Sequence, residues 1–424
     1  MKLMPKKSIV VLGAGFGGLK AAFDLNRGLR RRDLLDQYEI HLVDRNSYHT
    51  YTPTLYEIST TSKETANYVG LKQIVAFEIA ELIKKTAINF IKAEIKELDL
   101  LGGDLHLANG SRLKCDYLIL AAGSETNYFG IPGLAELSLP LKNFIDALTI
   151  RDRIVELIAG GKKNLKIVIG GGGSAGVEIA GELAEWSEEL NEESGGFKSE
   201  ISIIEAGPTM LPGFDPKIVS KAQRRLREIG IQLINNEAID RALPDKVLLK
   251  SGAEISYDVL IWTGGVKASS LISPLPLKIE KRGRVEVAGK MECLPQTPNL
   301  KLYGKIYGIG DVVCFYDPKT GKPMPGVARA AIIQGGIAAH NVIADITGSG
   351  NYKEYQPMNY PYVVPIGGKW ALAKLGPLVI AGFFGWILKG LVELNYLLSI
   401  MPLSRAMKVW LHGLMIFIRN DRLG

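Results

Sequence analysis

Two glycine-rich turns of the same kind constrain this chain more than any other feature. Each follows an apolar run and precedes a helical pattern: residues 13–18 read GAGFGG, and residues 171–176 read GGGSAG. About thirty residues after each turn, an acid ends another strand-like run, Asp44 in the first case and Glu205 in the second. One such motif is a weak signal, but two in strand-turn-helix context predict an α/β chain with two Rossmann-like dinucleotide-binding domains.

Each glycine of such a turn has its own physical role. The first permits the tight passage from strand to helix, the second lets the backbone approach a pyrophosphate, and the third lets the helix pack closely on the strand. Unpaired amides at the helix start, with the helix dipole behind them, hold the phosphate charge. The three positions are Gly13, Gly15 and Gly18 in the first turn, and Gly171, Gly173 and Gly176 in the second.

The two acids bear on the choice of nucleotide. A carboxylate at this position accepts hydrogen bonds from ribose hydroxyls, so Asp44 and Glu205 each favour a nucleotide without a 2′-phosphate. Glu205 is followed by Ala-Gly-Pro, with no Lys or Arg to pair with such a phosphate. NADH is therefore favoured over NADPH. Two dinucleotides in one chain indicate a flavoprotein that passes a hydride from a nicotinamide to a flavin; the alternative is an α/β protein whose turns bind no nucleotide.

Bulk composition excludes several classes. The 424 residues predict two or three domains, and the formal net charge of +7 suits a soluble enzyme or contact with an anionic membrane surface. Basic-aromatic tracts of the nucleic-acid type are absent. Cys115, Cys293 and Cys314 are far apart, so dithiol chemistry and a metal site have no support, and each is expected to be a buried small hydrophobe. The first strand begins too early for a signal peptide, so we expect the enzyme to face the cytoplasm.

Strand and helix patterns predict an inserted domain. Residues 1–150 and 300–365 form the first, discontinuous domain, with a helix starting near Val327, and residues 151–299 form the second. Residues 366–424 form a C-terminal membrane-association region.

The C-terminal region is apolar but is not free of charge. Residues 377–400 are long enough to span a bilayer, yet Lys389 and Glu393 lie on one helix face in their middle, and burying that pair in lipid costs several kcal/mol. After Pro402, a second helical stretch carries a basic face and an opposite apolar face. The basic face is Arg405, Lys408, His412 and Arg419, and the apolar face is Met407, Trp410, Leu411, Leu414 and Ile418. This pattern favours helices lying in the membrane interface; a dimer interface, core packing or a transmembrane helix are the alternatives.

The chain resembles the type II NADH:quinone oxidoreductases, single-subunit flavoenzymes with two dinucleotide-binding domains. The resemblance covers nearly the whole chain, and residues 122–133 and the tail carry its most specific part. The matching stretches are residues 13–18, 52–57, 122–133, 171–182, 262–266, 310–311 and the C-terminal tail.

The resemblance implies FAD, non-covalently bound, in the first domain and NADH in the second. FAD would contact Gly13, Gly15, Phe16, Gly17, Gly18, Asp44, Thr52, Pro53, Ala122, Gly123, Gly310, Asp311 and Ala328. NADH would contact Gly171, Gly173, Ser174, Gly176, Glu205 and Gly265. The helix beginning at 327–329 would point its positive end at the flavin edge that becomes negative on reduction.

Three further residues are implied near the reacting groups. Glu178 would lie near the nicotinamide and flavin, although a solvated acid near the start of its helix is the plain alternative. The family usually has Ala-Gln where this chain has Ala328-Arg329, so Arg329 is expected either to donate to a quinone or to pair with a local acid. Gln334 matches a second family glutamine.

The expected activity is a non-proton-pumping, FAD-dependent NADH:quinone oxidoreductase. It would lie peripherally on the cytoplasmic face of the cell membrane, with quinone as substrate, no nucleic-acid partner and a possible homodimer. The alternatives are a soluble NAD(P)H-dependent reductase of a small redox protein and a flavin-binding signalling or scaffold protein.

Overall fold

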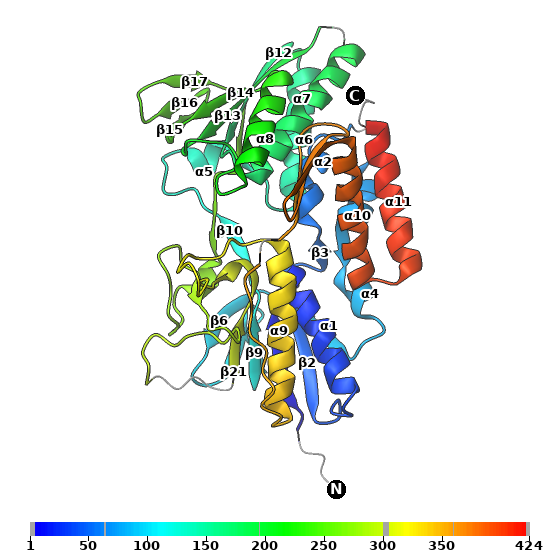
Figure 1. The fold of residues 1–424 in the computed structure, drawn as a ribbon, viewed down its shortest axis with the longest axis vertical. Coiled ribbons are helices and arrows are strands. Elements are labelled where there is room, and N and C mark those ends of the chain that lie inside the picture. Colours follow the sequence, from blue (N-terminus) through cyan, green and yellow to red (C-terminus); the bar gives the residue numbers. More distant parts are fainter. Residues whose placement is uncertain (1–4, 63–64, 195, 300–304, 359, 421–424) are drawn as a thin grey trace. The chain divides into compact units, whose positions relative to one another are not determined.

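A computed structural model describes residues 5–62, 65–194, 196–299, 305–358 and 360–420, apart from the side chains of residues 193, 194, 419 and 420 (Figure 1). The chain forms two compact units, and each is described here by itself. Unit 1 comprises Met1–His49, Phe77–Glu125 and Val266–Met358, and unit 2 comprises Thr50–Ala76, Thr126–Gly265 and Asn359–Gly424.

Unit 1 is built on a five-stranded, all-parallel sheet with the order β21-β9-β1-β2-β5. Strand β1 is buried at five of its six positions, because a parallel sheet is covered on both faces and its strands read as continuous apolar runs. The strands are β1 (Lys7–Leu12), β2 (Tyr38–Asp44), β5 (Ile88–Lys92), β9 (Tyr117–Leu120) and β21 (Lys305–Gly308). Residues 300–304, with which the predicted second segment of the first domain begins, lie outside the described residues.

Helices α1 (Phe16–Arg30) and α9 (Ala328–Ile346) lie side by side in unit 1 (Figure 1). Glycines make this close approach possible. A Cβ atom on Gly335 would collide with the carbonyl of Gly17, and one on Gly17 would lie 2.9 Å from the carbonyl oxygen of Ala331. Helix α9 begins one residue after Val327, as the sequence predicted.

Smaller elements complete unit 1, including an antiparallel sheet β6-β7-β8. They are α4 (Ile79–Ile83), β6 (Ile95–Asp99), β7 (Asp104–Leu107), β8 (Arg112–Lys114), β19 (Val266–Ala268), η2 (Ser270–Ile272), β20 (Val285–Glu286), η3 (Gly310–Val312) and β22 (Val313–Cys314). At β3 (Tyr48–Thr50), β4 (Ala76–Glu78) and β10 (Ser124–Thr126) the chain passes from one unit to the other. Residues 266–299 belong to this unit, whereas the sequence placed them in the second domain. The reason is apolar packing: Leu277 and Val285 are buried in the unit 1 core, and Val285 pairs with Val313.

Unit 2 repeats the parallel design with the order β11-β18-β12-β13-β14. A capping box between Asn143 and Asp146 starts α6, and Asp215 caps α8 with Pro216 at its first position. The strands are β11 (Leu139–Pro140), β12 (Asn164–Gly170), β13 (Lys198–Glu205), β14 (Gln232–Asn235) and β18 (Val259–Trp262); the helices are α5 (Leu134–Leu137), α6 (Phe144–Ala159), α7 (Ser174–Ser194) and α8 (Pro216–Glu228). An antiparallel sheet adds β15 (Ile239–Leu243), β16 (Lys246–Leu249) and β17 (Glu254–Ser256).

The C-terminal segment packs within unit 2 and does not form a third body. Ile366, in the connection after β23, approaches Gly181 of α7 so closely that a side chain on this glycine would collide with it. The segment contains β23 (Tyr362–Pro365), β24 (Ala371–Leu375), β25 (Leu378–Gly382), α10 (Phe383–Ile400) and α11 (Leu403–Asn420). Residues 50–76 and 126–150, which the sequence placed in the first domain, also belong to this unit. The first of these stretches forms η1 (Thr52–Thr54), α2 (Leu55–Ile58) and α3 (Tyr68–Val75). Helix α3 contacts α11.

Replacing Gly335 by Ala tests the α1–α9 contact. We expect the free energy of unfolding to fall by about 1–3 kcal/mol, because the added methyl group meets backbone that has no room to move. Gly336 is the matched control, since its Cβ would find only side-chain atoms at 3.4 Å or more, and Gly336→Ala should gain up to about 1 kcal/mol from helix propensity. Equal midpoints for the two variants in thermal unfolding would contradict the packing argument.

Candidate active site: two glycine cradles and a buried charge cluster

The first glycine turn has the geometry of a phosphate cradle. Gly13 has φ +108°, and a side chain there would collide with the carbonyl of Ala121 in the connection after β9. A side chain on Gly18 would collide with the carbonyl of Gly13. Gly15, in contrast, has no atom within 4 Å of its would-be Cβ. The protein's own backbone therefore leaves no room for a side chain at Gly13 or Gly18, whereas a side chain at Gly15 would enter open space.

Asp44 fixes the shape of this turn. One carboxylate oxygen accepts a hydrogen bond from the Ala14 amide at 2.7 Å, and the other accepts one from the Asn46 amide at 2.8 Å. Each oxygen has further acceptor capacity, so the same carboxylate can still receive a ribose hydroxyl.

His49 is a residue of this cradle that the sequence reasoning did not single out. Its Nδ1 donates to the Ala14 carbonyl at 2.9 Å, and its ring contacts the Phe16 ring edge-to-face at 5.1 Å. Burial lowers the pKa of His49 to about 4, so the ring is neutral at physiological pH. The aromatic-rich stretch after Asp44 was the available signal.

Residues distant in sequence from the first glycine turn form a second wall of the cradle in unit 1. Gly123 has φ +68° and open space beside it, and Ala122 precedes it. The Ser124 hydroxyl donates to an Asp311 carboxylate oxygen at 2.9 Å. Gly310 has φ +75° and donates its amide to the Gln334 side-chain oxygen at 2.8 Å. Gln334 thus holds the turn that presents Asp311. Its predicted position near the reacting groups stays a prediction.

Helix α9 presents an uncapped start beside this wall. Val327 makes no side-chain capping hydrogen bond, so the amides of the first turn, which begins at Ala328, have no side-chain partner at the cap. Arg329 is exposed and makes no ion pair within the described part of the chain. Pairing with a local acid, one of the two expectations for Arg329, is therefore not seen there.

The second cradle, in unit 2, reproduces the first. Gly171 has φ +106°, a side chain on Gly176 would collide with the Gly171 carbonyl, and Gly173 has open space. Ser174 is the first residue of α7. Glu205 accepts hydrogen bonds from the amides of Gly172 and Gly207, both at 2.7 Å.

The remaining predicted cofactor residues of unit 2 fall in two places. The Gly265 carbonyl, after β18, accepts the Asn127 amide at 3.0 Å, and a Cβ on Gly265 would lie 2.8 Å from the Phe129 ring. Thr52 and Pro53 are exposed in η1. Their predicted position near the isoalloxazine stays a prediction.

A cluster of buried charges lies between α2, α7 and α10 of unit 2. Lys389 forms an ion pair with Glu57, and both side chains are nearly inaccessible, at 14% and 4% exposed. Glu393 and Glu182 are also buried. Glu178, which is partly buried, feels the charges of Glu57 and Lys389.

Burial raises the pKa of three carboxyl groups in the cluster. Burial raises the pKa of Glu178 to about 8, with a further increase from Glu57 and an opposing decrease from Lys389. Burial likewise raises the pKa of Glu393 to about 7 and also raises the pKa of Glu57. Glu178 is thus a partly buried acid with a raised pKa, and its predicted position near the nicotinamide and flavin stays a prediction. Carboxylates that outnumber their one buried cation cannot all ionise, because each unpaired buried charge is costly.

The three cysteines are buried and free, as predicted. Burial raises the pKa of the Cys115 thiol to about 12. None of them is poised as a thiolate nucleophile.

Two similar cradles, each with its own acid and helix, define an oxidoreductase of the two-nucleotide α/β class. The chain belongs to the pyridine nucleotide-disulphide oxidoreductase family, which it matches over residues 7–335. This confirms the predicted fold class and enzyme class.

Similar proteins carry the name that the motifs suggested. A type II NADH:quinone oxidoreductase of Mycobacterium tuberculosis is 26% identical over 95% of this chain and 87% of its own length. One of Staphylococcus saprophyticus is 28% identical over 84% of this chain and 86% of its own. Among solved structures, NDH2 from Plasmodium falciparum in complex with NADH has a TM-score of 0.82 at 18% identity, covering 98% of both chains, which shows a shared fold. The predicted resemblance is confirmed.

Removing the lysine tests the charge cluster. Lys389→Met leaves Glu57 buried without its cation, so we expect a loss of about 3–5 kcal/mol in unfolding free energy. Glu57→Gln combined with Lys389→Met should recover part of that loss, and the exposed Lys408→Met should change little. Strictly additive effects in the double-mutant cycle would show that the two residues do not interact.

Proposed function

We propose that this protein is an FAD-dependent NADH:quinone oxidoreductase that works at a membrane surface. The observation that carries the proposal is the pair of matched cradles, because hydride chemistry between two dinucleotides needs two such sites in one chain. The names of the similar proteins support the choice of NADH and quinone.

FAD fits the cradle of unit 1. The open space at Gly15 suits a pyrophosphate, Asp44 suits the adenosine ribose, and Asp311 suits the ribityl region. The uncapped amides at the start of α9, which begins at Ala328, would stabilise negative charge on the flavin edge. When bound, FAD supplies the two-electron acceptor for NADH and passes the electrons on to quinone.

NADH fits the cradle of unit 2, with Gly173 and Ser174 at the pyrophosphate and Glu205 at the ribose. Glu178 lies on the second turn of the same helix and is protonated at neutral pH. We assign it the role of a neutral hydrogen-bond donor beside the reacting groups. Arg329 would donate to a quinone carbonyl in place of the family glutamine.

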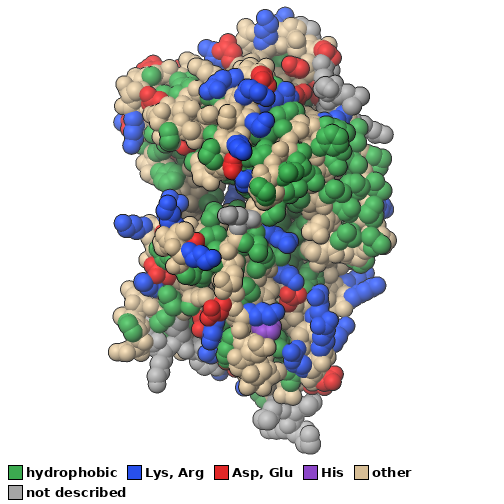
Figure 2. Space-filling model, in the orientation of Figure 1, with side chains coloured by type: hydrophobic (Ala, Val, Ile, Leu, Met, Phe, Trp, Pro, Cys, Tyr) green, Lys and Arg blue, Asp and Glu red, His purple; other side chains and the backbone are tan. Residues whose placement is uncertain are grey.

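The C-terminal helices are proposed to lie in the membrane interface. Figure 2 shows hydrophobic side chains gathered over α10 and α11. Six of those on α10, α11 and β25 are more than half exposed: Leu378, Phe383, Phe384, Val392, Leu403 and Met415. An apolar surface of this kind marks a membrane or partner contact.

Helix α10 is long and apolar enough to cross a bilayer by length and composition, with a third of its residues buried. Lys389 of this helix pairs with Glu57 of α2, and Glu393 is buried within unit 2, so the apolar remainder suits a surface position better than a crossing. We therefore propose a peripheral, non-proton-pumping enzyme on the cytoplasmic face of the cell membrane, which forms a homodimer through its C-terminal helices.

Purified protein tests the activity directly. We expect flavin absorbance that bleaches on addition of NADH and returns on addition of a short-chain quinone. Bleaching without reoxidation by quinone would favour a soluble reductase of a small redox protein.

NADPH should act far more weakly than NADH, and Glu205→Gln should narrow that difference, because a carboxylate repels a 2′-phosphate.

The pKa of Glu178 predicts a pH profile. Since the acid is neutral below about pH 8 and ionised above it, kcat/KM for NADH should fall as the pH rises through about 8. Glu178→Gln keeps a neutral donor at every pH, so its profile should lose that fall. The exposed Glu188 on the same helix provides the control, and Glu188→Gln should keep the wild-type profile. An unchanged inflection in Glu178→Gln would remove Glu178 from the site.

A further inference from the structure

Helix α8 of unit 2 carries a basic stripe that the proposed reaction does not use. Lys217, Lys221 and Arg224 follow the i, i+4, i+7 spacing of one helix face. Lys217 and Arg224 are exposed, and Lys221 is partly exposed. Arg224 contacts Glu228 at 3.3 Å, whereas Lys217 and Lys221 make no ion pair within the described residues. These three residues are called the α8 basic stripe.

Other basic residues of this region serve the fold, and they fix the position of the stripe. Lys374 of β24 pairs with Asp215, the cap of α8, at 2.6 Å. Arg225 donates to a Glu185 carboxylate oxygen at 3.2 Å, and its guanidinium lies 5.5 Å from the centre of the Trp370 ring. These contacts hold α8 against the segment that carries β23, β24 and β25.

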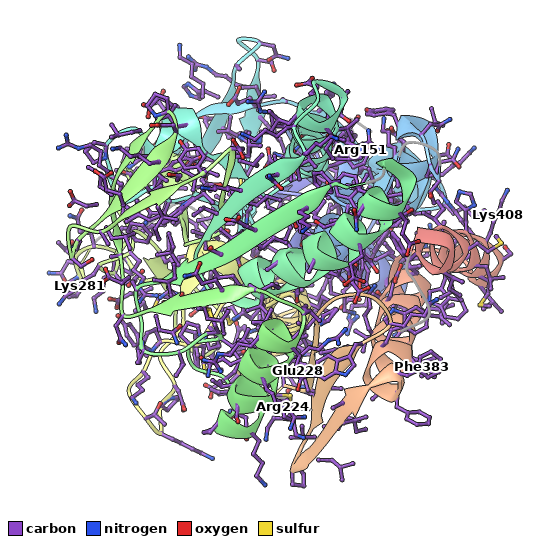
Figure 3. All side chains as sticks on the ribbon, turned by 90° about the horizontal axis from the view of Figure 1, so that it is seen from above. Arg151, Arg224, Glu228, Lys281, Phe383 and Lys408 are labelled. Atoms are coloured by element: carbon purple, nitrogen blue, oxygen red, sulfur yellow. The ribbon has the colours of Figure 1, made fainter. Side chains whose placement is uncertain are left out.

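That segment leads directly into the apolar surface of the C-terminal helices. At the turn between β24 and β25, Leu375 and Leu378 are 38% and 58% exposed, and α10 starts with the exposed Phe383. In the view from above, Arg224 of α8 and Phe383 of α10 lie on either side of the β24–β25 hairpin (Figure 3). Lys and Arg side chains over α8 lie beside the hydrophobic surface in Figure 2.

We propose that the α8 basic stripe binds the phosphate groups of anionic phospholipids when the C-terminal apolar surface enters the bilayer. The inference rests on the membrane association proposed above. Lysine ammonium groups are mobile point charges that suit a fluid array of phosphates. An anionic lipid surface, not an acidic protein, is the occupant that continuity with the exposed Leu378 and Phe383 favours.

The stripe therefore gives unit 2 a second contact with the membrane, separate from the terminal helices in sequence. It holds the unit in one orientation on the bilayer. Because the contact is electrostatic, it strengthens with the content of anionic lipid and weakens with salt.

The test compares vesicles of phosphatidylcholine alone with vesicles that also contain phosphatidylglycerol, using full-length protein in co-sedimentation. Wild type should bind the mixed vesicles more tightly at low salt. The variant Lys217→Glu with Lys221→Glu should lose at least roughly tenfold in partition onto the mixed vesicles, since each basic residue near an anionic surface contributes about 1 kcal/mol. Its partition onto phosphatidylcholine should stay as in wild type, because the apolar surface is intact.

A charge-matched control is Arg241→Glu with Lys250→Glu. Both residues are exposed on or beside the β15-β16-β17 sheet, at the side of unit 2 away from α10 (Figure 1). If this control loses as much binding as the α8 variant, net charge alone is responsible and the proposal is wrong. Retained binding by the α8 variant also overturns it and points to an acidic protein partner. If the wild type binds neither kind of vesicle, both membrane association and the proposal for the α8 basic stripe are wrong. Oxidation of NADH by a short-chain quinone tests the proposed enzyme activity separately.

Discussion

The structure of both units depends on the close approach of backbone to backbone at a glycine turn. In unit 1 the turn at Gly13 meets the carbonyl of Ala121, and in unit 2 the turn at Gly171 meets the backbone of Thr263 and Gly264. No residue with a Cβ fits either position. Once the turns close, Asp44 and Glu205 can each reach a loop amide at 2.7 Å, and the helix that follows points its first amides at the open glycine.

Around this repeated core, the two units differ in what they add. Unit 1 adds α9, whose glycine-mediated contact with α1 brings Gln334 to the amide of Gly310. Unit 2 adds the C-terminal sheet and helices, whose buried Lys389 meets Glu57 and lies near Glu178. Lys389, which ties the C-terminal segment to unit 2, thus also belongs to the charge cluster that includes Glu178 of α7.

The sequence predicted the features that local pattern determines. The glycine turns, the start of α9 and the two apolar C-terminal helices follow from patterns local in sequence, and each acid follows from its place at the end of the next strand-like run. The ion pair between Lys389 and Glu57 could not be predicted from local pattern, because Glu57 is 332 positions away in the chain and nothing near it in sequence signals a buried acid. The sequence also assigned residues 266–299 to the other domain. Their place in unit 1 depends on the pairing of Val285 with Val313, and these two residues are distant in sequence.

The central claim is that each chain holds two nucleotides at once. A calorimetric titration of NAD⁺ into purified, FAD-containing protein, with the flavin content measured before and after, tests it most directly. The account predicts saturable NAD⁺ binding at one site per chain with the flavin content unchanged. Release of FAD as NAD⁺ binds, or no NAD⁺ binding to protein that retains its flavin, would contradict it.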